Sequence, residues 1–480
     1  MRRLPAWIAR LDGVRARAAP ALRSPRAPAA LAALVGLVAL VPRWGFAVEE
    51  HPPRLYVFGD MAIYLERGVA LTERARTAWD TFTPPGYPAL LALLHAAAPG
   101  DLALVGACQA ALGALTAALA ALFAYRLDRS LAVAALAGLA TALYFPLVFY
   151  AGFVLTETAF AFLLLLFAWL ELRALEHGRD RGRAALGLAA GGALGLAVLV
   201  RPSLLAFLPW VAFRAARGAG PDRRVAGATL LACALVIAPV SAHTSWLLGR
   251  PALVATNGGV NFYLAHSACR SVRSTAGGEV VEVSTHYNRT HFERRCELPR
   301  PFLDEGAYYR AGLAEIAEHP GRLLRAWTGV AEGLGLAPRR AWPNQPFWPG
   351  SVEHEAVLDA SSRLFVPLVL LPAVVHAIAR ARGARRGRGG GGGEGEEGGE
   401  AGAAREGGPG ADAGARARGI AWAILASVVV VLYVYNGNPR VRVSSDPLAL
   451  ALAASAWAAG ARRLLESFAL ALASRRAGPP

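Results

Sequence analysis

The sequence predicts an all-α polytopic membrane protein with about ten transmembrane helices. The chain has 480 residues, 55% of them hydrophobic, and a mean hydropathy of +0.37, values too apolar for a soluble protein of this length. The apolar residues are gathered into runs, most of them near the ~20 residues that cross a bilayer as one helix. The runs lie at 28–42, 103–125, 131–149, 153–171, 184–200, 203–215, 227–248, 362–380, 419–435 and 447–461.

Arginine residues between the runs predict the orientation of the chain. Loops rich in arginine stay on the cytoplasmic side, and residues 1–27 hold many of them. Counting the crossings from a cytoplasmic N-terminus places on that same side the loops at 126–129, 173–183, 214–224 and 379–418 and the C-terminus. The formal net charge of +16 therefore reflects membrane topology, and we expect no nucleic acid partner.

The same count predicts the order of segments along the chain. The Gly-rich stretch GRGGGGGEGEEGGE cannot form a hydrophobic core, so we expect it to be a flexible linker. The expected segments are a cytoplasmic N-terminus (1–27), a transmembrane module (28–248) with a first outer loop (43–102), an outer-face loop domain (249–361), a transmembrane helix (362–381), a cytoplasmic linker (382–418), a C-terminal transmembrane hairpin (419–463) and a cytoplasmic tail (464–480).

The segment 86–98, GYPALLALLHAAA, is expected to form a juxtamembrane helix in the outer interface. Its 13 residues are too few to cross a bilayer. Pro84, Pro85 and Pro88 bend the chain that leads into it, so that the apolar helix can lie along the membrane surface. A surface helix beside an open groove would let a lipid reach a site sideways from the bilayer.

The loop 249–361 is expected to fold on the outer face. Its stretch 304–327 has leucine and isoleucine at helical spacing, and Pro320 divides it into two helices. Cys269 and Cys296 both lie in this loop. An oxidising compartment would allow a disulfide between them, but their spacing alone leaves the pairing open.

Five charged residues interrupt the apolar pattern at one membrane face. Asp60, Glu157, Arg201, Arg440 and Arg442 all fall at outward helix ends or outward loops. Each has an ordinary explanation alone, because acids favour the first turn of a helix and arginines snorkel to head groups. Together, carboxylates and guanidiniums at the outer interface indicate a site that handles an anionic lipid head group.

Several motifs resemble those of the GT-C membrane glycosyltransferases, specifically glycosyltransferase family 39. This is the dolichyl-phosphate-mannose protein mannosyltransferase-like group, which includes enzymes that move aminoarabinose onto lipid A. The resemblance covers most of residues 28–330, and the order of the motifs makes it specific. The motifs are GDMAIYLERG (59–68), TPPGYPALLALL (83–94), LYFPLVFYAGFVLTET (143–158), GLAVLVRP (195–202), NGGVNFYLAH (257–266) and EHPGRLLRAW (318–327).

The resemblance implies a GT-C fold and a mechanism. Enzymes of this group pass a sugar from a polyprenyl-phosphate donor to an acceptor hydroxyl on the outer side, with inversion. Asp60 matches the acid of the first loop, which acts as the general base or as a carboxylate that positions the substrate. Glu157 would be a second carboxylate that positions the acceptor or holds a cation. Arg201, Arg440 and Arg442 would bind the donor phosphate, since arginine suits bidentate phosphate contacts.

The resemblance also implies a substrate pocket that contains Tyr64, Tyr87, Asn261 and His266. The last outward loop departs from the family, which often has an Arg-Tyr pair there, because Val441 follows Arg440. No cofactor is required, and a divalent cation is left open. The implied partners are the polyprenyl-phosphate sugar donor, membrane lipid and an acceptor lipid, protein or glycan. Apart from the resemblance, the lysine-free composition and the Gly-rich linker favour a bacterial inner membrane, with the site facing the periplasm or exterior.

Two other functions stay open. A polytopic transporter would also have charges between its helices, but transporters place their sites near the bilayer midplane and often contain internal repeats. An oligosaccharide polymerase or ligase would also use lipid-linked sugars at the outer face. That enzyme would not need the first-loop Asp60 together with the segment PPGYP.

Overall fold

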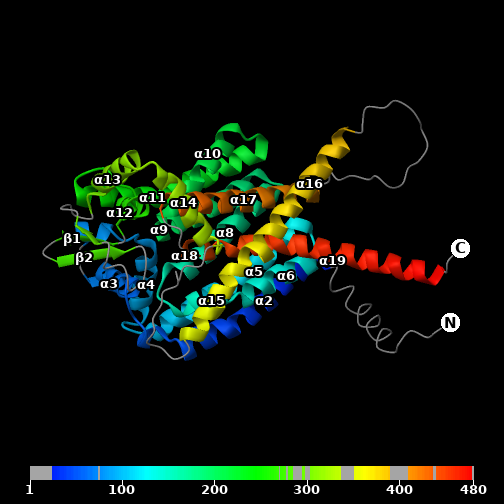
Figure 1. The fold of residues 1–480 in the computed structure, drawn as a ribbon, viewed down its shortest axis with the longest axis horizontal. Helices are drawn as coiled ribbons and strands as arrows, with labels where there is room; N and C mark the ends of the chain where they lie inside the picture. Colours follow the sequence, from blue (N-terminus) through cyan, green and yellow to red (C-terminus); the bar gives the residue numbers. More distant parts are fainter. Residues whose placement is uncertain are drawn as a thin grey trace.

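The computed structural model is a bundle of long helices with smaller elements gathered at one end (Figure 1). It describes residues 24–73, 76–269, 271–276, 279–284, 295–297, 303–336, 351–389, 409–435 and 439–477. Among these residues, eight helices are long and apolar enough to cross a membrane, and a pair bent by 55° would make nine. The predicted all-α polytopic fold is therefore confirmed, and the chain is an integral membrane protein.

The helices follow the predicted runs with few exceptions. They are α2 (Ala27–Trp44), α3 (Asp60–Glu73), α4 (Gly86–Ala97), α5 (Leu102–Asp128), α6 (Leu131–Leu143), α7 (Phe145–Phe149), α8 (Thr156–Glu176), α9 (Asp180–Val200), α10 (Leu208–Arg217), α11 (Gly220–Leu248), α12 (Gly258–His266), α13 (Glu305–Glu318), α14 (Gly321–Gly333), α15 (Ser351–Phe365), α16 (Leu371–Gly389), α17 (Pro409–Val434), α18 (Pro439–Val443) and α19 (Asp446–Ala477). Shorter or irregular turns are η1 (Gly45–Glu50), η2 (Pro53–Leu55), η3 (Ala78–Thr81), η4 (Tyr150–Gly152), η5 (Pro202–Phe207) and η7 (Val366–Leu370).

The predicted run 203–215 is not a long helix but a broken connection made of η5 and α10. It nevertheless runs the length of the bundle. Arg201, before it, bonds Thr156 of α8, and Arg214, near its end, bonds Glu171 of the same helix. Those two α8 residues are 171 − 156 = 15 positions apart, or ~22 Å along a helix. The order of the loops at the two ends therefore agrees with the predicted count, although one connection is short.

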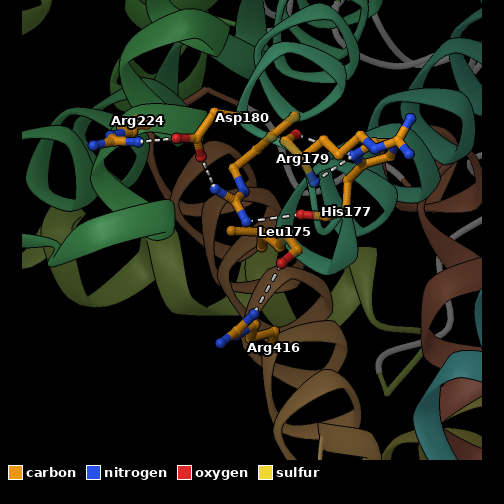
Figure 2. A network of polar contacts seen from close by, with 7 residues as sticks. Leu175, His177, Arg179, Asp180, Arg224 and Arg416 are labelled. Atoms are coloured by element: carbon orange, nitrogen blue, oxygen red, sulfur yellow. Dashed lines mark hydrogen bonds and ion pairs between the residues drawn. The ribbon is translucent and has the colours of Figure 1, made fainter.

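The predicted arginine-rich loops meet at one end of the bundle. Arg224 bonds Asp180 at 2.8 Å, and Arg416 donates to the carbonyl oxygen of Leu175 at 3.1 Å (Figure 2). Further pairs at this end join segments far apart in sequence: Arg129 with Glu176, and Arg380 and Arg418 with Asp128. We call this the arginine end, and the opposite end, where α3 begins, the Asp60 end.

The bend between α6 and α7 is stabilised by a buried arginine from α2. A helix leaves its last carbonyl groups without intrahelical partners, which is costly inside a bilayer. Arg43, which is fully buried, donates to the carbonyl oxygens of Ala142 at 2.7 Å and Thr141 at 3.0 Å, in the last turn of α6. Gly113 of α5 leaves the space that this guanidinium occupies, since a Cβ there would lie 2.6 Å from Arg43 Nε.

At the Asp60 end, α3 and α4 pack as a close pair against the bundle. A Cβ on Gly68 of α3 would lie 2.8 Å from Leu91 of α4, and one on Gly86 would lie 2.6 Å from the backbone of Leu199. Helix α4 has 12 residues and is not among the candidate spans. The predicted short helix at 86–98 is therefore present beside the end of α9.

The described residues between 249 and 336 form a small unit, which we call the mixed unit, at the Asp60 end. It contains α12, α13 and α14, and the predicted helix break at Pro320 is confirmed. Three strands that the apolar runs did not reveal, β1 (Ser271–Ala276), β2 (Glu279–Ser284) and β3 (Arg295–Glu297), form a sheet of order β2-β1-β3, with β1–β2 antiparallel and β1–β3 parallel. A disulfide joins Cys269 to Cys296, with their Cα atoms 5.7 Å apart.

Several helices extend beyond the predicted segment boundaries. The span after the mixed unit begins at Glu353 rather than 362, because α15, η7 and α16 continue one another. Helix α16 continues to Gly389 and α17 starts at Pro409, so part of the predicted 382–418 linker is helical. The described part of the predicted 464–480 tail belongs to α19, whereas residues 1–23 and 390–408 lie outside the described residues.

Candidate active site

Asp60 is placed by a turn that only glycine makes easily. Gly59 has φ of +51°, in the left-handed region that side chains disfavour. The turn ends an extended stretch and starts α3, whose first residue is Asp60. The Asp60 carboxylate is 41% exposed and accepts a hydrogen bond from Arg440 Nη1 at 2.8 Å. Asp60 therefore forms an ion pair with a segment far away in the sequence. It also occupies the first turn of α3, where acids are favourable.

Glu157, the second acid of the site, lies in the first turn of α8. Its carboxylate is fully buried and bonds Arg201 Nη2 at 2.7 Å and also Arg440 Nε. Arg201 ends α9 because Pro202 follows it, and the residue before a proline is driven out of the helical region. That break turns the Arg201 side chain back toward α8, where its Nε donates to Thr156 Oγ1 at 2.8 Å.

Arg440 joins the two acids from a segment near the C-terminus. It lies in α18, a five-residue helix whose next residue, Ser444, donates from Oγ to the backbone oxygen of Glu157 at 3.1 Å. Burial alone would lower the pKa of Arg440, but the charges of Glu157 and Asp60 outweigh burial and raise it well above its ordinary value. This guanidinium is therefore a permanent cation.

Asp60, Arg440, Glu157 and Arg201 form a row of alternating charge, which we call the quartet. They come from α3, α18, α8 and the end of α9, and the sequence places Asp60 and Arg440 380 residues apart. The two cations balance the two acids, so the quartet is neutral overall. Its two acids differ in exposure, because Glu157, between the two guanidiniums, is fully buried, while Asp60, at one end of the row, is 41% exposed. Asp60 is therefore the acid that an incoming group can reach.

The two predicted pocket tyrosines lie side by side but differ in exposure. The rings of Tyr64 and Tyr87 meet edge to face, with centroids 5.4 Å apart. Tyr64 is half-buried, and burial followed by the charge of Asp60 raises the pKa of its phenol. Tyr87 is fully buried, and its hydroxyl donates to Gln109 at 3.1 Å. Tyr87, predicted to belong to the substrate pocket, is therefore enclosed by protein and packs behind Tyr64.

Arg442 makes different contacts from those of the quartet. Its guanidinium is buried 3.5 Å from the centroid of the Phe365 ring and 3.5 Å from Asp446 Oδ2. Arg440 and Arg442 are two residues apart in α18, so their side chains leave the helix on different sides. A phosphate contact by Arg442 has no support in this geometry, since Phe365 and Asp446 cover the guanidinium.

Asn261 and His266 lie in α12 of the mixed unit. Asn261 Nδ2 donates to the carbonyl oxygen of Asn257 at 2.9 Å, within the same helix. His266 Nε2 donates to the carbonyl oxygen of Val434 at 3.0 Å, at the end of α17, and burial lowers the pKa of this imidazole. Both contacts are with backbone oxygens, so His266 fastens the mixed unit to α17 rather than joining the quartet.

Sequence reasoning missed three residues that support the quartet. Thr156 accepts from Arg201, Ser444 bonds the backbone of Glu157, and the ring of Phe160 lies 5.6 Å from the Arg201 guanidinium. Thr156 and Phe160 flank Glu157 on α8, so helical spacing could have pointed to them. Within the described ranges, no group of three His, Cys, Asp or Glu side chains could hold a metal ion.

Comparison with known proteins supports the resemblance seen in the sequence. Residues 101–217 match the family model described as dolichyl-phosphate-mannose-protein mannosyltransferase, which confirms the resemblance over α5 to α10. No curated protein sequence gives a significant match to this chain.

Two solved structures align with the chain, and both are oligosaccharyltransferases of Archaeoglobus fulgidus. One is the archaeal enzyme AglB in complex with an inhibitory peptide and a dolichol-phosphate, 14% identical, with 94% of this chain and 52% of that chain covered and a TM-score of 0.45. The other is tethered to an acceptor peptide containing the NVT sequon, 12% identical, with 90% and 50% covered and a TM-score of 0.45. The chain spans about half the length of these two solved chains.

Proposed function

We propose that this chain, a membrane glycosyltransferase of the GT-C type, transfers a sugar from a polyprenyl-phosphate donor to an acceptor hydroxyl on the outer face of the membrane. The observation that carries the proposal is the quartet, in which a reachable carboxylate lies beside two fixed guanidiniums. A base on the attacking hydroxyl and cations on the departing phosphate are what this transfer needs.

Asp60 is proposed as the general base. The acceptor oxygen attacks the anomeric carbon, its proton passes to Asp60, and the bond from that carbon to the phosphate oxygen breaks. The polyprenyl phosphate leaves with the bonding electron pair, so a phosphate leaving group needs no protonating acid. Attack from the side opposite the phosphate gives inversion. The exposure of Asp60 supports this role, because a proton acceptor must touch its substrate.

Arg201 and Arg440 are proposed to stabilise the departing phosphate. Each keeps its position through a carboxylate, so the cations are in place before negative charge develops on the leaving group. Glu157 is fully buried between them and is proposed to position both guanidiniums rather than to contact the acceptor. No cofactor step is assigned, and a divalent cation would be an addition to this machinery.

The orientation and compartment are also proposals. The arginine end is the one that the positive-inside bias keeps in the cytoplasm, so the quartet at the Asp60 end would face outward. Helix α4, which packs beside α3 and the end of α9, would then lie in the outer interface where a lipid donor arrives. In a bacterium this is the inner membrane, with the site facing the periplasm or exterior. The acceptor would be a lipid, a protein or a glycan.

Donor turnover tests the proposal directly. Purified protein in detergent is given short polyprenyl-phosphate sugars, with membrane extract as acceptor, and release of free polyprenyl phosphate is followed by mass spectrometry. We expect release by the wild type and a loss of ~10²-fold or more in Asp60→Asn, the range that general-base catalysis contributes. Release at equal rates by both proteins would remove Asp60 as the base, and folded wild type that is inactive with every donor would contradict the proposed function.

A further inference from the structure

A small open hollow beside the quartet is lined by two arginines and one aspartate. We propose that it binds an anionic group of the acceptor, either a phosphate or a carboxylate. The identification of the acceptor as the molecule that carries this anionic group rests on the proposed function. The hollow is shallow and open to solvent, and its enclosed part has room for about one water molecule, so a bound anion would lie across its mouth. Its lining comes from α3, the loop around η3 and the start of α4: Arg67, Ala70, Leu71, Arg76, Asp80, Thr83, Pro85 and Pro88.

Arg67 is a buried cation with an unused donor. Its side chain is 9% exposed, and its Nη1 bonds Asp80 Oδ1. Its Nε is also buried and has no hydrogen-bond partner in the part of the chain that the structure describes. A buried donor without an acceptor is unfavourable, so a shift of the Arg67 side chain that brings its guanidinium to an anion at the hollow would relieve this cost.

The charge of Asp80 is already engaged on its other side. Its Oδ2 accepts from the backbone nitrogen of Thr77 at 2.6 Å and from Thr77 Oγ1 at 3.0 Å. These bonds form the capping box of η3, so Asp80 serves the loop as well as Arg67. In the lining, the single carboxylate of Asp80 therefore stands against the two arginines, Arg67 and Arg76.

Arg76 provides the second cation. It is half-buried and bonds the loop through a long contact, from Nη2 to the carbonyl oxygen of Asp80 at 3.5 Å. The lining therefore carries a net charge of +1. Glu66 lies 4.0 Å from Arg67 but is 66% exposed and outside the lining. Two guanidiniums around a small hollow suit a phosphate or carboxylate, which accepts several charged hydrogen bonds at once.

The position of the hollow assigns its ligand to the acceptor. Asp60, Tyr64 and Arg67 follow one another at i, i+4 and i+7 on α3, and such residues lie on one face of a helix. Seven residues of helix span ~10 Å. The donor phosphate is bonded to the carbon under attack, so it must lie within a few ångströms of the acceptor oxygen at Asp60. An anion ~10 Å away is therefore a different group, and we infer an acceptor with a hydroxyl and a phosphate or carboxylate at about that separation.

Binding of inorganic phosphate tests the hollow without any turnover. Equilibrium dialysis of radiolabelled phosphate against the full-length protein compares wild type with Arg76→Gln, Arg440→Gln and the matched control Arg325→Gln, an exposed arginine of α14. We expect two phosphate sites in the wild type and in the control. Arg76→Gln should weaken phosphate binding at the hollow at least tenfold, and Arg440→Gln should do the same at the quartet. Thermal unfolding of each variant shows that it is folded, and Arg76→Lys should retain part of the binding. Two unchanged sites in folded Arg76→Gln would overturn the proposal.

Turnover with matched acceptors tests whether the anion belongs to the acceptor. Membrane extract is divided into lipid and aqueous fractions, each used before and after phosphatase treatment, to distinguish a lipid phosphate from a glycan phosphate. We expect the wild type to prefer one fraction. Phosphatase removes that preference if the anion is a phosphate and leaves it unchanged if the anion is a carboxylate. Arg76→Gln should lose the preference through a raised KM with little change in kcat. The proposal would be overturned by equal KM values for Arg76→Gln and wild type. If the wild type releases nothing from any donor, the proposed function fails, while the dialysis result still decides whether the hollow binds an anion.

Discussion

Glu157 and Asp60 both bond Arg440, yet replacing each of them should have a different effect on the free energy of unfolding. Glu157 is fully buried and serves two guanidiniums, those of Arg201 and Arg440. Glu157→Gln keeps the shape of the side chain but leaves two cations sharing Asp60 as their quartet acid, and breaking a buried ion pair costs ~3–5 kcal/mol. Asp60 is 41% exposed, so Asp60→Asn should cost about 1 kcal/mol or less.

The assay measures both quantities on one preparation. The free energy of unfolding is followed by tryptophan fluorescence as SDS is titrated into detergent-solubilised protein, and donor turnover is measured before unfolding. Asp60→Asn should unfold like the wild type while losing turnover, whereas Glu157→Gln should unfold at clearly lower SDS. Glu66→Gln, at a 66% exposed acid on the same helix as Asp60, is the control. Equal unfolding free energies for Asp60→Asn and Glu157→Gln would refute the reasoning from burial.

Two further substitutions and the reduction of one disulfide test features that position the site and the mixed unit. Gly113→Ala should lower the free energy of unfolding by ~1–3 kcal/mol, because the new Cβ would lie 2.6 Å from Arg43 Nε, and SDS titration measures it. Gly59→Ala should cost ~1–2 kcal/mol and reduce turnover, since φ of +51° is strained for alanine and Asp60 follows it. Reducing the Cys269–Cys296 disulfide, which closes a separation of 27 residues, should destabilise the mixed unit by ~3 kcal/mol, seen as faster proteolysis.

Matched controls separate these effects from general damage. Gly192→Ala, in α9 with no atom within 4 Å of the new Cβ, should leave the free energy of unfolding unchanged or raise it by up to ~1 kcal/mol, in contrast to Gly113→Ala. Gly45→Ala, at a helical φ and in open space, is the counterpart of Gly59→Ala. A Gly113→Ala protein as stable as its control would mean that Arg43 can move aside. Unchanged proteolysis after reduction would show that the core of the mixed unit suffices alone.

The arrangement of the quartet was predictable in part from the sequence. That Asp60, Glu157, Arg201 and Arg440 lie at one end of the bundle follows from counting apolar runs, because each run reverses the direction of the chain. Their residue types follow from local rules, such as acids in first helical turns and an arginine before a helix-breaking proline. Which of them touch does not follow, since four helix ends at one face can meet in many pairings.

The sequence by itself determined the membrane class, the order of the helices, the short helix after PPGYP, and the face at which the charged residues gather. These properties depend on local hydropathy, proline positions and arginine-rich loops, which act within about twenty residues. Only the tertiary structure decided that Arg440 joins Asp60 to Glu157, that Arg442 turns to Phe365, and that Tyr87 is buried behind the site. Those outcomes depend on packing between segments hundreds of residues apart. The direction and burial of each side chain are set by neighbours that a local sequence pattern cannot identify.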